Sequence, residues 1–205
     1  MPEPDRKKIK SFATPAKLAA WLRENHDKKD ELWVKVLKKH TGKASVTWTE
    51  IVIETLCWGW IDGMKKSIDD EAYLQRITPR KPRSGWSKRN REHAKRLIAE
   101  GRMEPPGLAQ IDAAKADGRW ENAYAPASEM VVPDDFVAAV NRKPKAKNFY
   151  ETLNKSARYA IAYGLTTAKK PETRQRRFNK FMDMLVRGEE PGFGFKKPAK
   201  KSNKK

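Results

Sequence analysis

The chain has 205 residues and a formal net charge of +19 at pH 7, with 45 lysines and arginines against 26 acidic residues and one cysteine. A single cysteine excludes an intramolecular disulfide and a cysteine-based metal cage, and no apolar run is long enough to cross a bilayer or to form a signal peptide. We therefore expect a cytoplasmic protein without membrane insertion, whose charge favours polyanionic partners such as nucleic acid or phosphate-bearing ligands.

Both ends of the chain are predicted to be disordered. The tail, residues 191–205, carries six lysines and no acid, and the start, residues 1–11, is also basic. Neither segment can bury enough apolar area to offset the entropy of ordering. Between them we predict a mixed α/β domain over residues 12–120 and a helical region over residues 133–190 that packs on it. The expected class is α+β, with a small antiparallel sheet and helices in the N-terminal half and a helical C-terminal half.

A helix and a strand are predicted before residue 40. Thr14 followed by Pro15 is typical of a helix N-cap with proline at the first helical position, and the apolar stripe continues to about Asn25. Residues 31–39, ELWVKVLKK, have the β-rich composition of a strand.

The next predicted element is a buried helix. Thr47 and Glu50 have the spacing of a capping box, and residues 48–58 are apolar on nearly every side. Gly59 is expected to end this helix, and a β-hairpin is expected over residues 63–78.

The rest of the chain has the periodicity and caps of helices. The predicted helices span residues 87–99, 106–116, 134–140, 144–153, 156–163 and 171–187.

A dense basic segment, RITPRKPRSGWSKRNREHAKRL, begins at residue 76 and supplies the predicted ligand site. Its helix is amphipathic, so several of its charges are explained as a solvated surface. A cluster of cations before a helix N-terminus is nevertheless electrostatically unfavourable, because the N-terminus carries a partial positive charge and attracts anions. We therefore predict that these groups converge on a phosphate-bearing or nucleic-acid ligand, with a tryptophan available for stacking. The predicted ligand-binding residues are Trp60, Asp62, Arg76, Arg80, Lys81, Arg83, Trp86, Ser87, Lys88, Asn90 and Arg174.

Two carboxylates are the candidate catalytic residues. Asp62 follows the most hydrophobic helix and Glu54 lies within it, and a buried carboxylate needs a cation or several donors. Either one suits acid–base work on a small anionic substrate, or a structural ion pair. An Asp62–Arg174 pair would join the C-terminal helix to the N-terminal half. Whether the chain is an enzyme stays open.

No cofactor or metal site is expected. The three histidines lack metal-ligand spacing, and the sequence contains no phosphate-binding glycine loop, nucleophile elbow or dinucleotide fingerprint. Cys57 lies in the apolar helix and is expected to be an inert core thiol.

Six blocks of sequence occur in a characteristic order. They are F.TP..L..WL..NH (12–26), ELWV (31–34), WTEIVIETLCWGWIDG (48–63), TPRKPRSGWSKRN (78–90), GRMEPPGL (101–108) and AKKPETRQRR (168–177). Together they resemble the bacteriocin-protection family, YdeI or OmpD-associated, over about residues 12–190. Trp58 stands where an aromatic residue, commonly Phe, is expected. The resemblance implies a compact cytoplasmic bacterial protein and, as an alternative function, a stress-protective module that binds a protein partner. It brings no catalytic residues.

Overall fold

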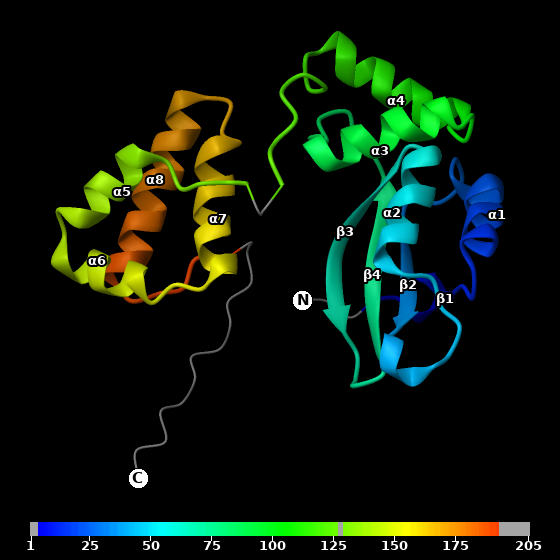
Figure 1. The fold of residues 1–205 in the computed structure, drawn as a ribbon, viewed down its shortest axis with the longest axis horizontal. Coiled ribbons are helices and arrows are strands. Elements are labelled where there is room, and N and C mark those ends of the chain that lie inside the picture. The colour runs from blue at the N-terminus through cyan, green and yellow to red at the C-terminus, as the bar shows by residue number, and fades with distance from the viewer. Residues whose placement is uncertain (1–3, 127–128, 193–205) are drawn as a thin grey trace. The chain divides into compact units, whose positions relative to one another are not determined.

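The computed structural model describes residues 4–126 and 129–192 (Figure 1). The chain divides into two compact units, residues 1–124 and residues 125–205. The predicted disordered tail lies outside the described residues from residue 193 onward.

Unit 1 contains the sheet. Its strands run in the order β1-β2-β4-β3, with β1 parallel to β2 and the other neighbours antiparallel. The predicted α+β class is confirmed, and one parallel pair is added to the antiparallel sheet that we expected. The strands are β1 (Ile9–Ser11), β2 (Leu32–Leu37), β3 (Trp60–Ser67) and β4 (Ala72–Pro79). The helices are α1 (Pro15–Asn25), α2 (Trp48–Cys57), α3 (Lys88–Ala99) and α4 (Pro105–Ala116).

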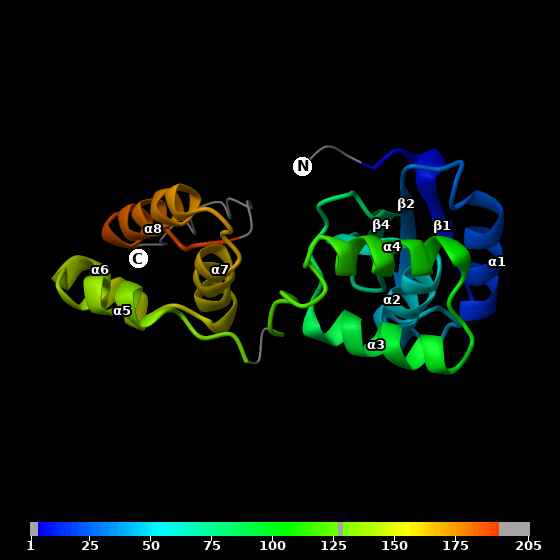
Figure 2. The same ribbon diagram turned by 90° about the horizontal axis from the view of Figure 1, so that it is seen from above.

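Helix α2 is the centre of unit 1, as the sequence predicted. The Thr47 side chain accepts a hydrogen bond from the Glu50 backbone, and the Glu50 side chain accepts one from the Thr47 backbone, so the capping box is present. Every residue from Ile51 to Cys57 is buried. Helix α2 packs against one face of the sheet (Figure 2), where Val34 and other strand residues join it in a single apolar core.

Two predicted boundaries in unit 1 were wrong. Residues 4–11 are not a disordered start, because Ile9 and its neighbours form β1 and pair in parallel with β2, beginning with Ile9 opposite Trp33. The hydrogen bonds of this ladder offset the entropy lost when the segment becomes ordered, which its few apolar residues could not offset alone. The hairpin begins at Trp60 rather than at Gly63, because Gly59 has a φ of 71° and turns the chain directly from α2 into β3.

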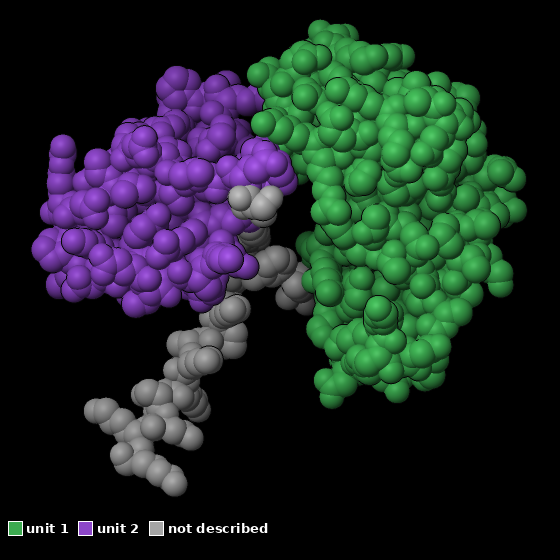
Figure 3. Space-filling view, in the orientation of Figure 1, with its two compact units in different colours: residues 1–124 green, residues 125–205 purple. Residues whose placement is uncertain are grey.

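Unit 2 is a bundle of helices in its described residues, shown in purple in Figure 3. Its core contains aromatic and aliphatic side chains from each helix, among them Phe136, Ala146, Ile161 and Leu185. The prediction of a helical C-terminal half is therefore confirmed. The helices are α5 (Asp134–Asn141), α6 (Pro144–Glu151), α7 (Lys155–Thr166) and α8 (Pro171–Val186).

Helices α2 and α4 meet backbone to backbone at Gly107. A Cβ atom at this position would collide with the carbonyl oxygen of Cys57 and would lie 2.8 Å from that of Leu56. Backbone carbonyls inside a packed helix cannot shift as the end of a flexible side chain can. Glycine is therefore required at residue 107 for α4 to cover α2.

We predict that Gly107→Ala destabilises unit 1 by about 2 kcal/mol, because the added methyl group overpacks this contact by more than alanine gains in helix propensity. Urea unfolding followed by tryptophan fluorescence measures the effect in unit 1 alone, since all seven tryptophans lie in that unit. Gly63→Ala is the matched control, because its Cβ would meet nothing closer than 3.7 Å. Equal stability of the two variants would contradict the prediction.

Candidate functional site

The structure places the predicted cations of the basic segment in three different environments. Arg76 lies on β4, and its Nε donates a hydrogen bond of 2.6 Å to the carboxylate of Glu31. Arg80 points inward and is 5% exposed. The others of the group face solvent, namely Lys81, Arg83 and Lys88. One of these five cations is thus neutralised, one is buried and three are exposed, and ligand binding by the exposed ones stays a prediction.

The N-terminus of α3 is occupied by the chain itself. The Ser87 hydroxyl accepts a hydrogen bond of 3.1 Å from the Asn90 backbone, and the Lys88 backbone donates one of 2.8 Å to the Tyr124 carbonyl. These amides were the donors that we expected to hold an anion. Because the chain supplies their acceptors, an anion at this helix terminus would have to displace them.

Two tryptophans assigned to the ligand site are core residues instead. Trp86 is 2% exposed, and its ring lies edge-on to Trp120 at 4.9 Å between centroids. Trp60 is 1% exposed, and its Nε1 donates to the His26 carbonyl at 3.1 Å. Neither ring has a free face for a base. Helical periodicity groups Trp86 with the apolar residue Leu97, and that signal outweighs its basic neighbours.

The exposed aromatic residue of this region is Trp48, which sequence reasoning missed. It is the first residue of α2 and is 37% exposed. Its indole Nε1 donates a hydrogen bond of 3.0 Å to Oδ2 of Asp62, and the guanidinium carbon of Arg89 lies 5.2 Å from its ring centroid. We call Trp48, Asp62 and Arg89 the Trp48 platform. The three residues come from α2, β3 and α3, so only their long-range packing reveals the group.

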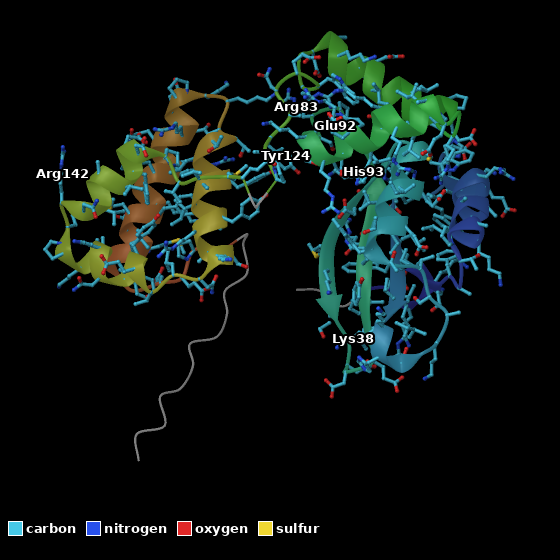
Figure 4. The ribbon with its side chains drawn as sticks, in the orientation of Figure 1. Lys38, Arg83, Glu92, His93, Tyr124 and Arg142 are labelled. Atoms are coloured by element: carbon cyan, nitrogen blue, oxygen red, sulfur yellow. The ribbon has the colours of Figure 1, made fainter. Side chains whose placement is uncertain are left out.

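Charge pairing changes along α3. In its later turns, Lys95 pairs with Glu92 at 3.2 Å and Arg96 pairs with Glu100 at 2.8 Å. Figure 4 shows Arg83 and Tyr124 at the end of α3 where the helix starts. Among the residues that the structure describes, four cations at this end have no ion pair with a carboxylate. They are Lys81, Arg83, Lys88 and Arg89, and we call them the unpaired cations.

Arg80 is the buried cation next to this surface. Its Nη1 donates to the Gly85 carbonyl at 3.2 Å, and its guanidinium carbon lies 3.9 Å from the centre of the Trp86 ring. Its Nε and Nη2 are buried and have no hydrogen-bond partner in the described structure. Burial lowers the pKa of Arg80 to about 10, with Tyr124 and Asp62 opposing the shift. The guanidinium is still charged at neutral pH.

The candidate acid–base residues have structural partners. Asp62 is half-buried and accepts the hydrogen bond of Trp48. Glu54 is buried on α2 and forms an ion pair of 2.7 Å with Arg102. Arg174 of α8 donates to Asp135 at 2.8 Å. Both members of the predicted Asp62–Arg174 pair thus have a partner within their own unit.

The remaining titratable core group is Cys57. Burial raises the pKa of its thiol to about 11, so it stays protonated at neutral pH. Within residues 4–126 and 129–192, no three histidine, cysteine or carboxylate side chains gather as metal ligands. No helix in those ranges is both long enough and apolar enough to cross a membrane.

Two family models match the chain, each over less than half of its length. Residues 129–188 match the family described as bacteriocin-protection, YdeI or OmpD-associated, which confirms the resemblance over that part. Residues 10–110 match a domain of unknown function, DUF8412. Of the blocks that carried the resemblance, only AKKPETRQRR (168–177) lies within 129–188. No curated protein and no solved structure matches the chain.

Burial makes the charge of Glu54 sensitive to pH. Desolvation raises the pKa of Glu54 above its ordinary value of 4.5, although Arg102 opposes the shift. A carboxyl group with a raised folded-state pKa adds stability below its unfolded pKa and loses it as the pH rises through the folded value. We therefore expect the free energy of unfolding, relative to Glu54→Gln, to be highest below pH 4.5 and to fall above it.

Urea unfolding of both proteins between pH 3.5 and 7 measures this difference, with about 1.4 kcal/mol expected for each pKa unit between the folded and unfolded states. Glu24→Gln, at an exposed position on α1, is the control. A relative stability of the native protein that increases above pH 4.5 would mean that the ion pair with Arg102 outweighs burial.

Proposed function

We propose that the chain is a binding module for a phosphate-bearing ligand, and that this ligand is single-stranded nucleic acid. The observation that carries the proposal is the cation–π contact of Arg89 with an exposed tryptophan, at the end of α3 where four described cations lack carboxylate partners.

The Trp48 platform supplies a fixed aromatic surface. The hydrogen bond to Asp62 anchors the indole edge, and both residues belong to regular secondary structure. Stacking of a base on an aromatic side chain contributes about 1 to 3 kcal/mol and tolerates any base. A guanidinium beside the same ring adds a cation for the neighbouring phosphate. A single strand suits this surface better than a duplex, because only an unstacked base can reach the ring.

The unpaired cations supply the electrostatic part of the proposed interface. A lysine or arginine already bound to a carboxylate gains little from a phosphate, since the ion pair must first break. Cations without such a partner bind phosphates and release the counterions of the nucleic acid. The formal net charge of +19 acts in the same direction at longer range.

Substituting Trp48 tests the stacking contribution. Trp48→Leu should lower the affinity for a single-stranded oligonucleotide about tenfold, which corresponds to the loss of about 1.4 kcal/mol from one stacked base. Trp48→Phe should retain most of the affinity, because it keeps a ring at the same place. Fluorescence anisotropy of a labelled oligonucleotide at low salt measures both, with circular dichroism as the check on folding. Unchanged affinity of the Trp48→Leu variant would refute the proposal that a base stacks on the Trp48 platform.

Neutralising the unpaired cations tests the electrostatic contribution. The triple substitution Lys81→Gln, Arg83→Gln, Lys88→Gln should reduce the slope of log affinity against log salt by about 2, from about 0.7 for each phosphate contact on a single strand. The matched control replaces Lys28, Lys29 and Lys39, which are exposed elsewhere on unit 1. Equal slopes for the two triple variants would mean that the oligonucleotide responds to the net charge of the chain and does not bind at the unpaired cations.

The match of residues 129–188 supports a second candidate function. The described family concerns bacteriocin protection, so unit 2 is the candidate for a stress-protective contact with a protein partner in the cytoplasm. Capture of one defined protein at high salt, unaffected by Trp48→Leu, would favour this function over nucleic-acid binding.

A further inference from the structure

Arg80 is a buried cation, and three of its five N–H donors lie on nitrogens that have no described hydrogen-bond partner. The side chain is 5% exposed, and no described carboxylate forms an ion pair with it. One terminal nitrogen, Nη1, donates to the Gly85 carbonyl. The other two nitrogens, Nε and Nη2, have neither solvent contact nor a hydrogen-bond acceptor. Buried donors and buried charges are rarely left in this condition in folded proteins.

The two unused donors lie on one edge of the guanidinium. Covalent geometry makes the Nε and Nη2 N–H bonds nearly parallel, which is the arrangement that binds two oxygens of one phosphate or carboxylate. The Trp86 ring covers a flat face of the guanidinium at 3.9 Å, and Gly85 occupies Nη1. The Nε–Nη2 edge is therefore the part of Arg80 that has no described partner.

The buried groups that act on Arg80 favour an anion over another cation as its ligand. Arg119 is also buried and lowers the pKa of Arg80, while its own charge is balanced by Asp117 at 2.6 Å. A third buried donor, Nε1 of Trp86, also lacks a described acceptor. Asp62 acts on Arg80 only at a distance, since its own hydrogen bond joins it to Trp48.

We propose that the Nε–Nη2 edge of Arg80 binds one phosphate group, either as the free ion or as part of a phosphate ester. The site is built from other residues than the Trp48 platform, so the two proposals can be tested separately.

A phosphate reaches Arg80 only if neighbouring residues move, because the two donors have no exposed surface. The loop from Lys81 to Gly85 adjoins Arg80 in the chain, and two side-chain hydrogen bonds hold it. Arg80 binds the Gly85 carbonyl, and Arg119 binds the Ser84 carbonyl at 2.8 Å. We expect the loop to move when these two bonds break, while the backbone hydrogen bond from Tyr124 to Trp86 stays in place.

The test compares the thermal unfolding of the full chain in inorganic phosphate and in chloride at equal ionic strength. The native protein should gain about 5 °C or more in Tm at a phosphate concentration of about 100 times Kd. Arg80→Met should lose this gain, because methionine fills a similar space without donors or charge. Arg23→Met, at an exposed position on α1, should keep the gain. Trp48→Leu should also keep it, which separates this site from the proposed nucleic-acid surface.

The stability of Arg80→Met without phosphate provides a second measurement. A Tm equal to or above that of the native protein is expected, since the variant no longer buries an unpaired charge. A large drop in Tm, together with an unchanged phosphate response, would mean that Arg80 stabilises the fold without binding phosphate and would overturn the proposal.

The Arg80 Nε–H signal in a ¹⁵N NMR spectrum identifies the source of the anion. A shift on adding inorganic phosphate supports the free ion, and a shift only with a single-stranded oligonucleotide supports a phosphodiester. No shift with either probe would overturn the site.

Discussion

The burial of α2 on all sides is the constraint on which unit 1 depends. A helix that is apolar around its whole circumference cannot be stable with one face in water, so the sheet, α1, α3 and α4 must each cover part of it. At Gly107, helix α4 approaches α2 so closely that there is no room for a side chain. The same constraint positions the Trp48 platform, because α2 begins at Trp48 and α3 begins beside it.

Local signals in the sequence predicted most helices and strands well. The capping box at Thr47 and the Thr14-Pro15 start act within a few residues, so their effect can be read without knowing the fold. Strand β1 was missed because it has only three residues in a basic segment. Its stability comes from pairing with β2, which lies more than 20 residues away in the chain, and composition does not encode that partner.

The candidate site was predicted less well, for a similar reason. The number of cations before α3 was evident, but which of them meet a carboxylate depends on distant residues. Arg76 finds Glu31 across the β2–β4 pair, whereas Arg89 meets Trp48. Basic character in a sequence therefore locates a region, and only tertiary packing separates neutralised cations from those that remain available for a ligand. Trp86 illustrates the same limit. Its basic neighbours suggested a role in ligand binding, but its ring is buried in the core.

Backbone hydrogen bonds join the segment around the start of α3 to the end of unit 1, and they determine where the chain can be cut to express this unit alone. Tyr124 receives a hydrogen bond from Lys88 and donates one to Trp86, although the family match of this unit stops at residue 110, inside α4. A recombinant fragment cut at that point would truncate a helix and uncover Trp86, whose neighbour Trp120 would be missing. Expression of the N-terminal unit by itself should therefore extend through Tyr124, fourteen residues past the homology boundary.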